Sequence, residues 1–565
     1  MPAVRVCVEC TRGLVRFPLE ETKLPQNDRF EELFRSFITG DLTRRNLILR
    51  TAGLGAAAAV VTVPGAGRIG SAFAQDATPV DTADIKMGGV LSMGMQSDPG
   101  TLDPQLQSLT ATWHIVEQIY SRLTKVNPDL SVSLELADTV DISEDGLTYT
   151  FTLHPANFHN GRAVVASDVV YSFERLVAPE TASPSAADLA SMSKIEAPDD
   201  STVVITLSQP DASFMAMLSN QSCIIIPKEV VEENTDLSQV AVGSGPFKFV
   251  EYVPNTHVKL EKNADYFETG LPYLDGLDML IAAEDNSRTA ALVSGTVDFI
   301  EYVPSQDIEI LQGDSSIKLA GNSIQQIRMI GFNLTKEPFN NPQVRQAISM
   351  AVDRGPIIDA ALSGYGTPTQ QIFSADFWAS LGPLDIPAPD IEGAKALLAE
   401  AGYPDGFKTT ITGWAEYGFL KNTAVVVQEQ LKQIGIDAEL NLLDSGSMGQ
   451  TVYIDKNFDM AVTGDSGFVD PNGLVYGNFK TDEGGNFVGY SNPDVDKLIA
   501  DGIATTDQAS RTEIYQQIAT TLMTDLPWVC LYIGQQYEGM KTFVMGYEHI
   551  PTGSNISIRQ VWLDK

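Results

Sequence analysis

The amino-acid sequence predicts an α/β protein with more than one lobe, and three observations lead to this fold class. The chain has 565 residues, which is more than one hydrophobic core usually holds, so two or three lobes are expected. Hydrophobic residues make up 43% and charged residues 19%, so the composition is that of a folded globular protein. Segments with a period of two alternate along the chain with helical segments, which is the pattern of α/β folds.

Turn and cap signals order the elements of the first half. The pair Asp145-Gly146 predicts a hairpin turn, and alternation of apolar and threonine residues predicts a strand directly after it. Ser167 and Asp168 are N-cap residue types and predict the start of a helix. The expected elements are a helix around residues 112–123, strands over 148–153 and 202–207, a helix ending at 290–295 and a strand over 297–300.

The second half continues the alternation. The glycine-rich stretch 243–247 is interpreted as a flexible crossover between lobes. Residues 463–492 hold many glycine, aspartate and asparagine residues and are predicted to form a long functional loop region. The further expected elements are helices over 342–353, 392–401, 424–434, 495–501 and 511–524, and a strand over 528–533.

The N-terminal region has the features of an export signal. Arg44 and Arg45 stand side by side before an apolar segment, residues 51–63, which is too short to span a bilayer. Ala72-Phe73-Ala74 supplies a small-residue cleavage pattern. Residues 1–74 are therefore predicted to be a twin-arginine leader that is removed after Ala74. Because the residue after Ala74 is not a cysteine, a lipid anchor is not expected. The mature chain is expected to be a soluble periplasmic protein.

The net charge excludes some classes of partner. The formal charge is −36, and a polyanion cannot neutralise phosphates, so neither nucleic acid nor an anionic membrane surface is expected as a partner. Cys7 and Cys10 form a single C-x-x-C within the leader, without the further ligands that zinc needs. Cys223 and Cys530 lie in apolar runs and are predicted to be buried free thiols, with a disulfide between them as the alternative.

Sequence motifs of the common hydrolases and nucleotide-binding enzymes are absent from the chain. There is no G-x-S-x-G, H-E-x-x-H or P-loop lysine motif, and the five histidines are scattered. No cofactor, metal site or catalytic residue is expected. Asp465 and Asp470 form a close pair of carboxylates that could act on a glycoside, so a secreted hydrolase is retained as an alternative.

Four blocks of the chain resemble one family of transport proteins. The first block is residues 145–153, 158–161 and 166–173, and the second is 243–247. The third is residues 332–333, 338–348 and 353–354, and the fourth is 489–496. With these blocks, in this order, the sequence resembles the extracellular solute-binding proteins of family 5, the dipeptide, oligopeptide and nickel-binding group of ABC importers. The similarity covers about residues 88–550.

The resemblance implies a fold and a partner. It implies an α/β fold of the periplasmic-binding-protein type (class II-like), in which two lobes close on a cleft and an extra, smaller domain is present. It also implies a monomer that is not an enzyme and that delivers its solute to a membrane permease. The implied domains are domain I at 88–120, 240–330 and 540–565, domain II at 121–239, and domain III at 331–539.

The resemblance also indicates candidate ligand-binding residues. In peptide-binding members an aspartate of the third domain pairs with the α-amino group of the ligand. One alignment places Asp465 at that position, and an alignment without gaps places Phe468 there, so both remain candidates. If Phe468 is correct, a sugar or an opine-like compound fits better than a peptide. The other candidates are Trp414, Tyr417, Tyr532, Thr112 and Trp113.

Overall fold

The computed structural model describes residues 85–106, 109–234, 237–415 and 417–565. The described residues form one compact unit, and the predicted leader with its paired arginines lies outside them. Within the described residues no helix is long and apolar enough to cross a membrane. Strands and helices alternate along this unit, so the predicted α/β class is confirmed at the level of the elements.

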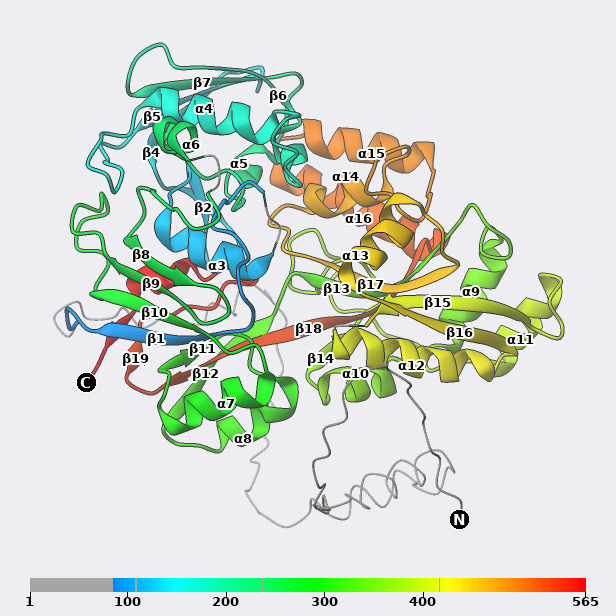
Figure 1. Ribbon diagram of the computed structural model, residues 1–565. Helices are drawn as coiled ribbons and strands as arrows, with labels where there is room; N and C mark the ends of the chain where they lie inside the picture. The colour runs from blue at the N-terminus through cyan, green and yellow to red at the C-terminus, as the bar shows by residue number, and fades with distance from the viewer. Residues whose placement is uncertain (1–84, 107–108, 235–236, 416) are drawn as a thin grey trace, which may run out of the picture. The chain divides into compact units, whose positions relative to one another are not determined.

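The largest sheet has twelve strands (Figure 1). Its main path runs in the order β16-β15-β17-β13-β18-β11-β1-β10-β9-β8, and β12 and β14 pair with β18 beside this path. The strands are β1 (Val90–Met95), β8 (Phe247–Val253), β9 (His257–Lys262), β10 (Gly276–Ile281), β11 (Phe299–Ile300), β12 (Ile317–Ser323), β13 (Gln326–Phe332), β14 (Gly366–Pro368), β15 (Phe407–Trp414), β16 (Ile436–Leu443), β17 (Met460–Ser466) and β18 (Trp528–Lys541).

Strand β18 belongs to both halves of this sheet. Its first half pairs with β13 and β14, and its second half pairs with β11 and β12. Between the two halves, the Ile324 N–H donates to Gly534 O at 3.3 Å. Two antiparallel segments, 323–326 and 533–535, therefore cross together from one half of the sheet to the other.

A separate sheet of four strands has the order β4-β5-β7-β6. It packs with α4 around a core that includes Phe151, Phe173 and Val203. Its strands are β4 (Ala137–Ile142), β5 (Thr148–Leu153), β6 (Met192–Glu196) and β7 (Thr202–Leu207), and two short ladders join β2 (Thr124–Val126) to β3 (Val132–Leu134) and β19 (Val544–Met545) to β20 (Trp562–Leu563). The strands that were expected over 148–153 and 202–207 thus have the predicted bounds.

Helices cover both faces of the half that contains β13, β15 and β17. Ile327 and Met329 pack with residues of α14, α15 and α16, whereas Ile330 and Phe332 pack with residues of α9 to α12. The helices are α3 (Thr110–Ile119), α4 (Ala166–Val177), α5 (Phe214–Met217), α6 (Lys228–Glu233), α7 (Asp285–Ser294), α8 (Ile308–Gln312), α9 (Pro342–Ala351), α10 (Arg354–Leu362), α11 (Ile391–Glu400), α12 (Gly418–Lys432), α13 (Ser445–Met448), α14 (Pro471–Phe479), α15 (Pro493–Ala504) and α16 (Gln508–Asp525).

The expected loop over residues 463–492 is wrong in its first half. Strand β17 continues to Ser466, and helix α14 follows from Pro471. Asp470 caps this helix by accepting from the Asn472 N–H at 2.9 Å, and Pro471 occupies its first turn. The cap and proline signals outweigh the polar composition of the segment.

The glycine-rich stretch at 243–247 is a close-packed crossover rather than a flexible one. A Cβ on Gly243 would lie 2.1 Å from Ile119 O, and one on Gly245 would lie 2.6 Å from the Ile119 carbonyl carbon. The Gly245 N–H donates to Ile119 O at 2.8 Å. These glycines are required because two backbone segments touch, and this corrects the flexible interpretation.

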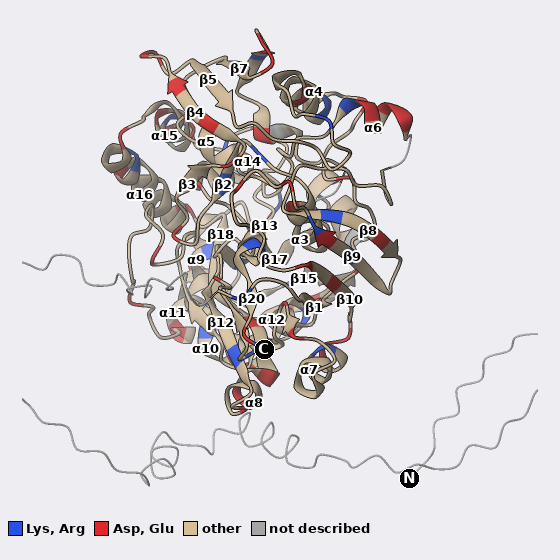
Figure 2. Ribbon diagram, turned by 90° about the vertical axis from the view of Figure 1, so that its left-hand side faces the viewer, with Lys and Arg blue, Asp and Glu red and all other residues tan. Residues whose placement is uncertain are grey.

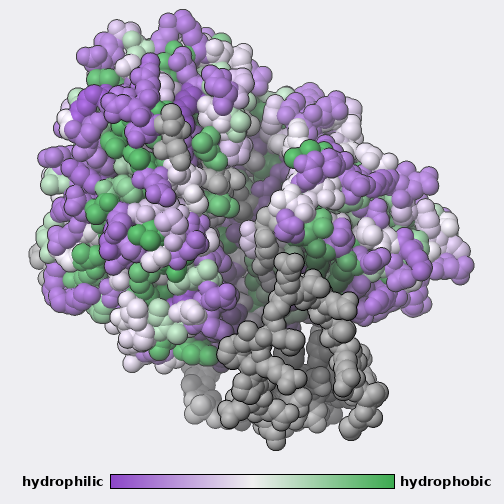
Figure 3. All heavy atoms as spheres, in the orientation of Figure 1, coloured by the Kyte–Doolittle hydropathy of each residue, from purple (hydrophilic) through white to green (hydrophobic). Residues whose placement is uncertain are grey.

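Cys223 and Cys530 are free and buried, as predicted. In the view of Figure 2, acidic residues occur on several elements, among them α6, α11 and β8, and α6 (KEVVEE) is the most strongly acidic of these three. On the face in Figure 3, hydrophobic residues occur in small groups among hydrophilic ones. Surface charge of this distribution is consistent with solubility rather than with one charged docking face.

Candidate functional site

The carboxyl ends of parallel strands from both halves of the large sheet carry polar and aromatic residues. In one half β1 runs parallel to β10 and β11, and Glu301 and Tyr302 directly follow β11. In the other half β15 runs parallel to β16 and β17; Trp414 ends β15 and Asp465 lies near the end of β17. Ligands of open α/β sheets bind at such carboxyl ends, which makes this region the candidate site.

Arg328 of β13 lies between these two groups of residues. Burial lowers the pKa of its guanidinium, while Tyr532, Asp465, Tyr302 and Tyr453 act electrostatically in the opposite direction. Tyr302 comes from one half of the sheet and the other three come from the other half. The surroundings of Arg328 are therefore where the two halves meet.

Among the described residues, Arg328 donates its hydrogen bonds to neutral acceptors. Nη2 donates to Gln326 Oε1 at 2.5 Å, and Nη1 donates to Ile327 O at 3.4 Å. The guanidinium also stands over the ring of Phe419, 5.2 Å from its centroid. The side chain is half-buried, so a charged group is held partly out of water next to an aromatic face.

Aromatic side chains surround the carboxyl ends of β15 and β17. Trp414 Nε1 donates to Thr463 Oγ1 at 3.2 Å, and the hydroxyl of Tyr453 lies 2.7 Å from the same oxygen. Tyr417 packs edge-on against Trp414 with ring centroids 5.4 Å apart, and it is 42% exposed. Tyr532 is buried, and its hydroxyl lies 3.0 Å from Thr423 Oγ1. Trp414, Tyr417 and Tyr453 thus form one polar-tipped aromatic group.

Tyr302 has an unusual backbone conformation. Its φ is +49°, a value that bulky residues rarely adopt. Arg288 Nη2 holds its carbonyl oxygen at 3.0 Å, and its ring stacks with His114 at 6.1 Å between centroids. Strain of this kind collects at functional sites, and it directs the phenol of Tyr302 toward Arg328 and Gly553.

Thr112 and Trp113 lie on α3 in the same half as Tyr302. The buried hydroxyl of Thr112 donates to Pro99 O at 2.6 Å, so it already has a protein partner. Trp113 Nε1 is buried and has no hydrogen-bond partner among the described residues. A buried indole N–H without a partner is unusual, and a bound molecule is one way to satisfy it.

The two candidates for the amine anchor differ in their surroundings. Asp465 accepts from Asn478 Nδ2 at 2.6 Å and lies opposite Ile327 in the β13–β17 ladder, one residue from Arg328. Phe468 is 7% exposed and packs against Phe373 and Phe377 within a hydrophobic core. Asp465 is the polar residue near Arg328, whereas Phe468 stabilises the core beneath this region.

The second carboxylate of the alternative hydrolase pair is engaged elsewhere. Arg511 Nη1 and Nη2 donate to the two carboxylate oxygens of Asp470 at 2.8 and 2.9 Å. Asp470 is also the N-cap of α14 and is 6% exposed. Both of its oxygens serve the fold, and this arrangement is not that of an acid–base pair open to a substrate.

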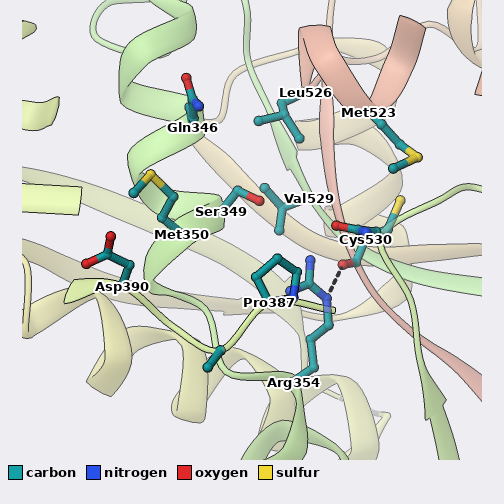
Figure 4. A pocket seen from close by; sticks show the side chains of 12 residues that line it. Gln346, Ser349, Met350, Arg354, Pro387, Asp390, Met523, Leu526, Val529 and Cys530 are labelled. Atoms are coloured by element: carbon teal, nitrogen blue, oxygen red, sulfur yellow. Dashed lines mark hydrogen bonds between the residues drawn. The ribbon is translucent and has the colours of Figure 1, made fainter. Parts of the chain in front are cut away.

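A further cavity of about 380 Å³ lies apart from these residues (Figure 4). Arg354 lines it and donates through Nε to Thr369 O at 2.7 Å and to Cys530 O at 2.9 Å. The lining residues come from α9, α10, the end of α16, the start of β18 and the segment 387–390. None of the sequence-derived candidate residues lines this cavity.

Sequence reasoning did not find Arg328, Tyr302 or Tyr453. Arg328 is the single charged residue in the apolar strand β13, and that contrast was a signal in the sequence. The described residues contain no group of three or more His, Cys, Asp or Glu side chains that could hold a metal ion.

Comparisons with known proteins agree on one family. A sequence model described as bacterial extracellular solute-binding proteins, family 5 Middle, matches residues 131–487. The glutathione-binding protein GsiB of Pectobacterium atrosepticum is 30% identical over 444 residues, which are 76% of this chain and 86% of the relative. The oligopeptide-binding protein AppA of Bacillus subtilis is 30% identical over 507 residues, or 85% and 92% of the two chains.

Solved structures with the same architecture carry bound solutes. The periplasmic binding protein AgaA of A. tumefaciens R10, in complex with agropinic acid, has a TM-score of 0.75 at 32% identity and covers 84% of this chain and 99% of its own. The periplasmic binding protein DppA of Helicobacter pylori, in complex with the peptide STSA, has a TM-score of 0.76 at 27% identity, with coverage of 85% and 99%.

Proposed function

The chain belongs to the bacterial extracellular solute-binding proteins of family 5, and on this premise we propose that it captures a small peptide-like solute for an ABC importer. The predicted α/β fold of the periplasmic-binding-protein type is confirmed by its structural neighbours. The observation that carries the proposal is the meeting of Trp414, Asp465 and Tyr302 around Arg328, at the carboxyl ends of strands from both sheet halves. An opine-like solute is the second candidate, because a structural relative is solved with agropinic acid.

The solute is proposed to bind between the lobes and to shift an equilibrium from open to closed forms. The two antiparallel crossings, 323–326 and 533–535, are the proposed hinge, because they lead from one half of the sheet to the other and are joined there by the hydrogen bond from the Ile324 N–H to Gly534 O. A ligand can drive closure only as far as it prefers the closed form. Residues proposed to line the site are Asp465, Trp414, Tyr417, Tyr532 and Trp113, with Thr112 and Phe468 supporting them.

The three-domain division is proposed to follow the sheets. Domain I is proposed at 88–120, 240–330 and 540–565, domain II at 121–239, and domain III at 331–539. Strands β4 to β7 all fall within 121–239, and β14 to β17 fall within 331–539, which supports the division. Strands β13 and β18 straddle the proposed boundaries because they form the crossings.

Export is proposed to use the paired arginines at Arg44 and Arg45, with cleavage after Ala74, and to deliver the mature chain to the periplasm. There the protein is proposed to act as a monomer that meets the permease with its ligand bound, and to leave the ligand chemically unchanged. Relatives of the family are solute-binding proteins rather than enzymes.

Titration calorimetry with three probes tests the function. The probes are reduced glutathione, the peptide Ser-Thr-Ser-Ala and agropinic acid, each added to protein that has been unfolded and refolded to remove bound molecules. Micromolar or tighter binding of at least one probe, with the probe recovered intact by mass spectrometry, is expected. Failure to bind any of the three contradicts the proposed ligand class, and hydrolysis of a probe favours the hydrolase alternative.

A further inference from the structure

We propose that Arg328 is the specificity-determining residue of the site and binds a carboxylate of the solute. The inference rests on the proposed function and deepens it by naming the ligand class. The solute is an anionic molecule with at least one free carboxylate next to hydroxyl or amide groups. Four observations from the residues around Arg328 carry this inference.

The first observation is that Arg328 is a half-buried cation whose hydrogen-bond partners are neutral. Its acceptors are the amide oxygen of Gln326 and the carbonyl oxygen of Ile327, at 2.5 and 3.4 Å. A charge taken out of water needs a counter-charge, and a guanidinium binds a carboxylate through two parallel N–H donors. Two other buried arginines have a carboxylate partner: Arg559 forms an ion pair with Glu135 at 2.7 Å, and Arg511 forms one with Asp470. Arg345 and Arg354 are buried as well but donate to backbone carbonyls.

The second observation concerns Asp465, the carboxylate nearest in the ladder. Asp465 acts on Arg328 electrostatically, yet its Oδ2 accepts from Asn478 Nδ2 at 2.6 Å. This bond holds the Asp465 side chain toward α14. Asp465 therefore orients Arg328 and offsets part of its positive charge. The N–H groups of the guanidinium can then bind a carboxylate of the ligand.

The third observation is a set of polar groups beside Tyr302. Gln536 is 5% exposed, and its Oε1 has no partner among the described residues, although its Nε2 donates to Glu538 at 2.8 Å. Thr552 Oγ1 is buried and also lacks a partner among them. Gln536 Oε1 and Tyr302 Oη both approach Gly553, as a Cβ built there would lie 3.6 and 3.7 Å from them. An acceptor at Gln536 suits an N–H or O–H of the ligand, and hydroxyls at Tyr302 and Thr552 suit its carboxylate.

The fourth observation is the aromatic group at the opposite side. Phe419 lies under Arg328, and Trp414 and Tyr417 pack against each other at the end of β15. Aromatic rings next to a cation favour a compact ligand body that stacks on one side and presents its carboxylate on the other. A long neutral or cationic solute has no counterpart for Arg328 in this arrangement.

The test compares each of the three probes with a form in which every carboxyl group is esterified or amidated. For each probe that binds, the free acid is expected to bind the wild type about 100-fold or more tightly than its neutral form. Arg328→Gln is expected to bind the free acid about 100-fold more weakly than the wild type does, and to bind the neutral form with the affinity of the wild type. Arg328→Lys is expected to recover part of the affinity, because it keeps the charge without the planar fork.

Lys408→Gln is the matched control, since it also removes one positive charge from the same half of the sheet at a side chain that is 89% exposed. It is expected to leave both affinities unchanged. A purely structural role of Arg328 would weaken acid and neutral forms alike, and that result overturns the inference. Equal binding of acid and neutral forms by the wild type overturns it as well, while leaving the proposed function intact. Binding of no probe by the wild type instead contradicts the proposed function, and the inference falls with it.

Discussion

His114 Nδ1 meets the carboxylate of Glu301, a residue 187 positions further along the chain, while its Nε2 lies 2.8 Å from Gly553 O. Both partners are acceptors, so the imidazole is held as a double donor. Burial favours the neutral ring, but the charge and hydrogen bond of Glu301 outweigh it and raise the pKa of His114 to about 9. One side chain thereby joins α3, the end of β11 and the C-terminal segment.

The stability of the protein is expected to fall as the pH rises through the His114 transition. The folded pKa of about 9 exceeds the ordinary value of 6.5, so the stabilisation is complete below pH 6.5 and is lost between 6.5 and 9. Its size is at most about 3 kcal/mol. Thermal unfolding of the wild type and His114→Gln across pH 5.5–9.5 measures it. The gap between the two proteins should narrow with rising pH, and a constant gap contradicts the prediction.

Gly243→Ala is expected to destabilise the protein by about 3 kcal/mol, because the new methyl group would overlap the Ile119 carbonyl. Denaturant unfolding without ligand measures the change. Gly477→Ala within α14 is the control, since apart from its chain neighbours and the backbone of its own helix no atom lies within 4 Å of its Cβ position; it should be neutral or stabilising by up to about 1 kcal/mol. Equal effects of the two substitutions would show that the close approach at Gly243 is relaxed in solution.

Asp465→Asn separates two kinds of ligand. If Asp465 pairs with a ligand ammonium, the substitution is expected to cost about 3–5 kcal/mol of binding free energy. If the ligand is a pure anion, removing a nearby negative charge should leave the affinity unchanged or raise it. Calorimetry with a binding probe, at matched pH and salt concentration, distinguishes the two.

Phe468→Ala is the companion variant. Its ring packs against Phe373 and Phe377, so the expected loss is about 3–5 kcal/mol of folding stability, with affinity affected only through the fold. Unfolding without ligand and calorimetry below the melting temperature separate the two effects. A large loss of affinity in a protein of unchanged stability would instead place Phe468 against the ligand.

Ligand binding is expected to compact the protein through the crossings at 323–326 and 533–535. Small-angle scattering with and without a saturating probe should show a smaller radius of gyration in the bound form. A radius that does not change at saturation argues against closure.

Export is expected to depend on both arginines of the leader. Replacement of Arg44 and Arg45 by lysine keeps the charge and removes the twin-arginine pair, so the periplasmic fraction measured by immunoblotting should fall strongly. Unchanged export would rule out the twin-arginine route. A Lys86→Arg variant beyond the leader serves as the control, because it changes a basic residue outside the signal.

Sequence reasoning predicted elements best where one local signal governed them. Alternating residues specified β5 and β7 to the residue. Ser167 and Asp168 indicated where α4 begins, but they lie inside its first turn; Val165 is the N-cap, and its N–H donates to Asp168 Oδ2. The same reasoning missed α14, where Asp470 and Pro471 were read as part of a polar loop. It ended the strand at 533, whereas β18 continues to Lys541, because the polar residues of its second half are buried only by the sheet around them.

The candidate site was harder to predict, for a physical reason. Asp465 was accessible to motif comparison, and Trp414 was a candidate as an aromatic that could stack on a ligand, but Arg328 became a candidate only when its neighbours from distant segments were known. The strained conformation of Tyr302 has no signature in the residues beside it. Which residues meet at such a site depends on how distant strands pair and in which register. Local sequence patterns do not reveal that pairing.

Strand β18 has a consequence for how the chain is made. It is among the last elements to be synthesised, yet it lies inside the large sheet, with β13 on one side and β11 on the other in the strand order (Figure 1). Until it emerges, β13, β11 and β12 each present an open edge, so neither half of the sheet can complete its hydrogen bonding during translation. A chain truncated before Trp528 is expected to remain sensitive to proteases in both halves. The strand that joins the two halves of the finished sheet is thus also the one that both halves lack until synthesis is nearly complete.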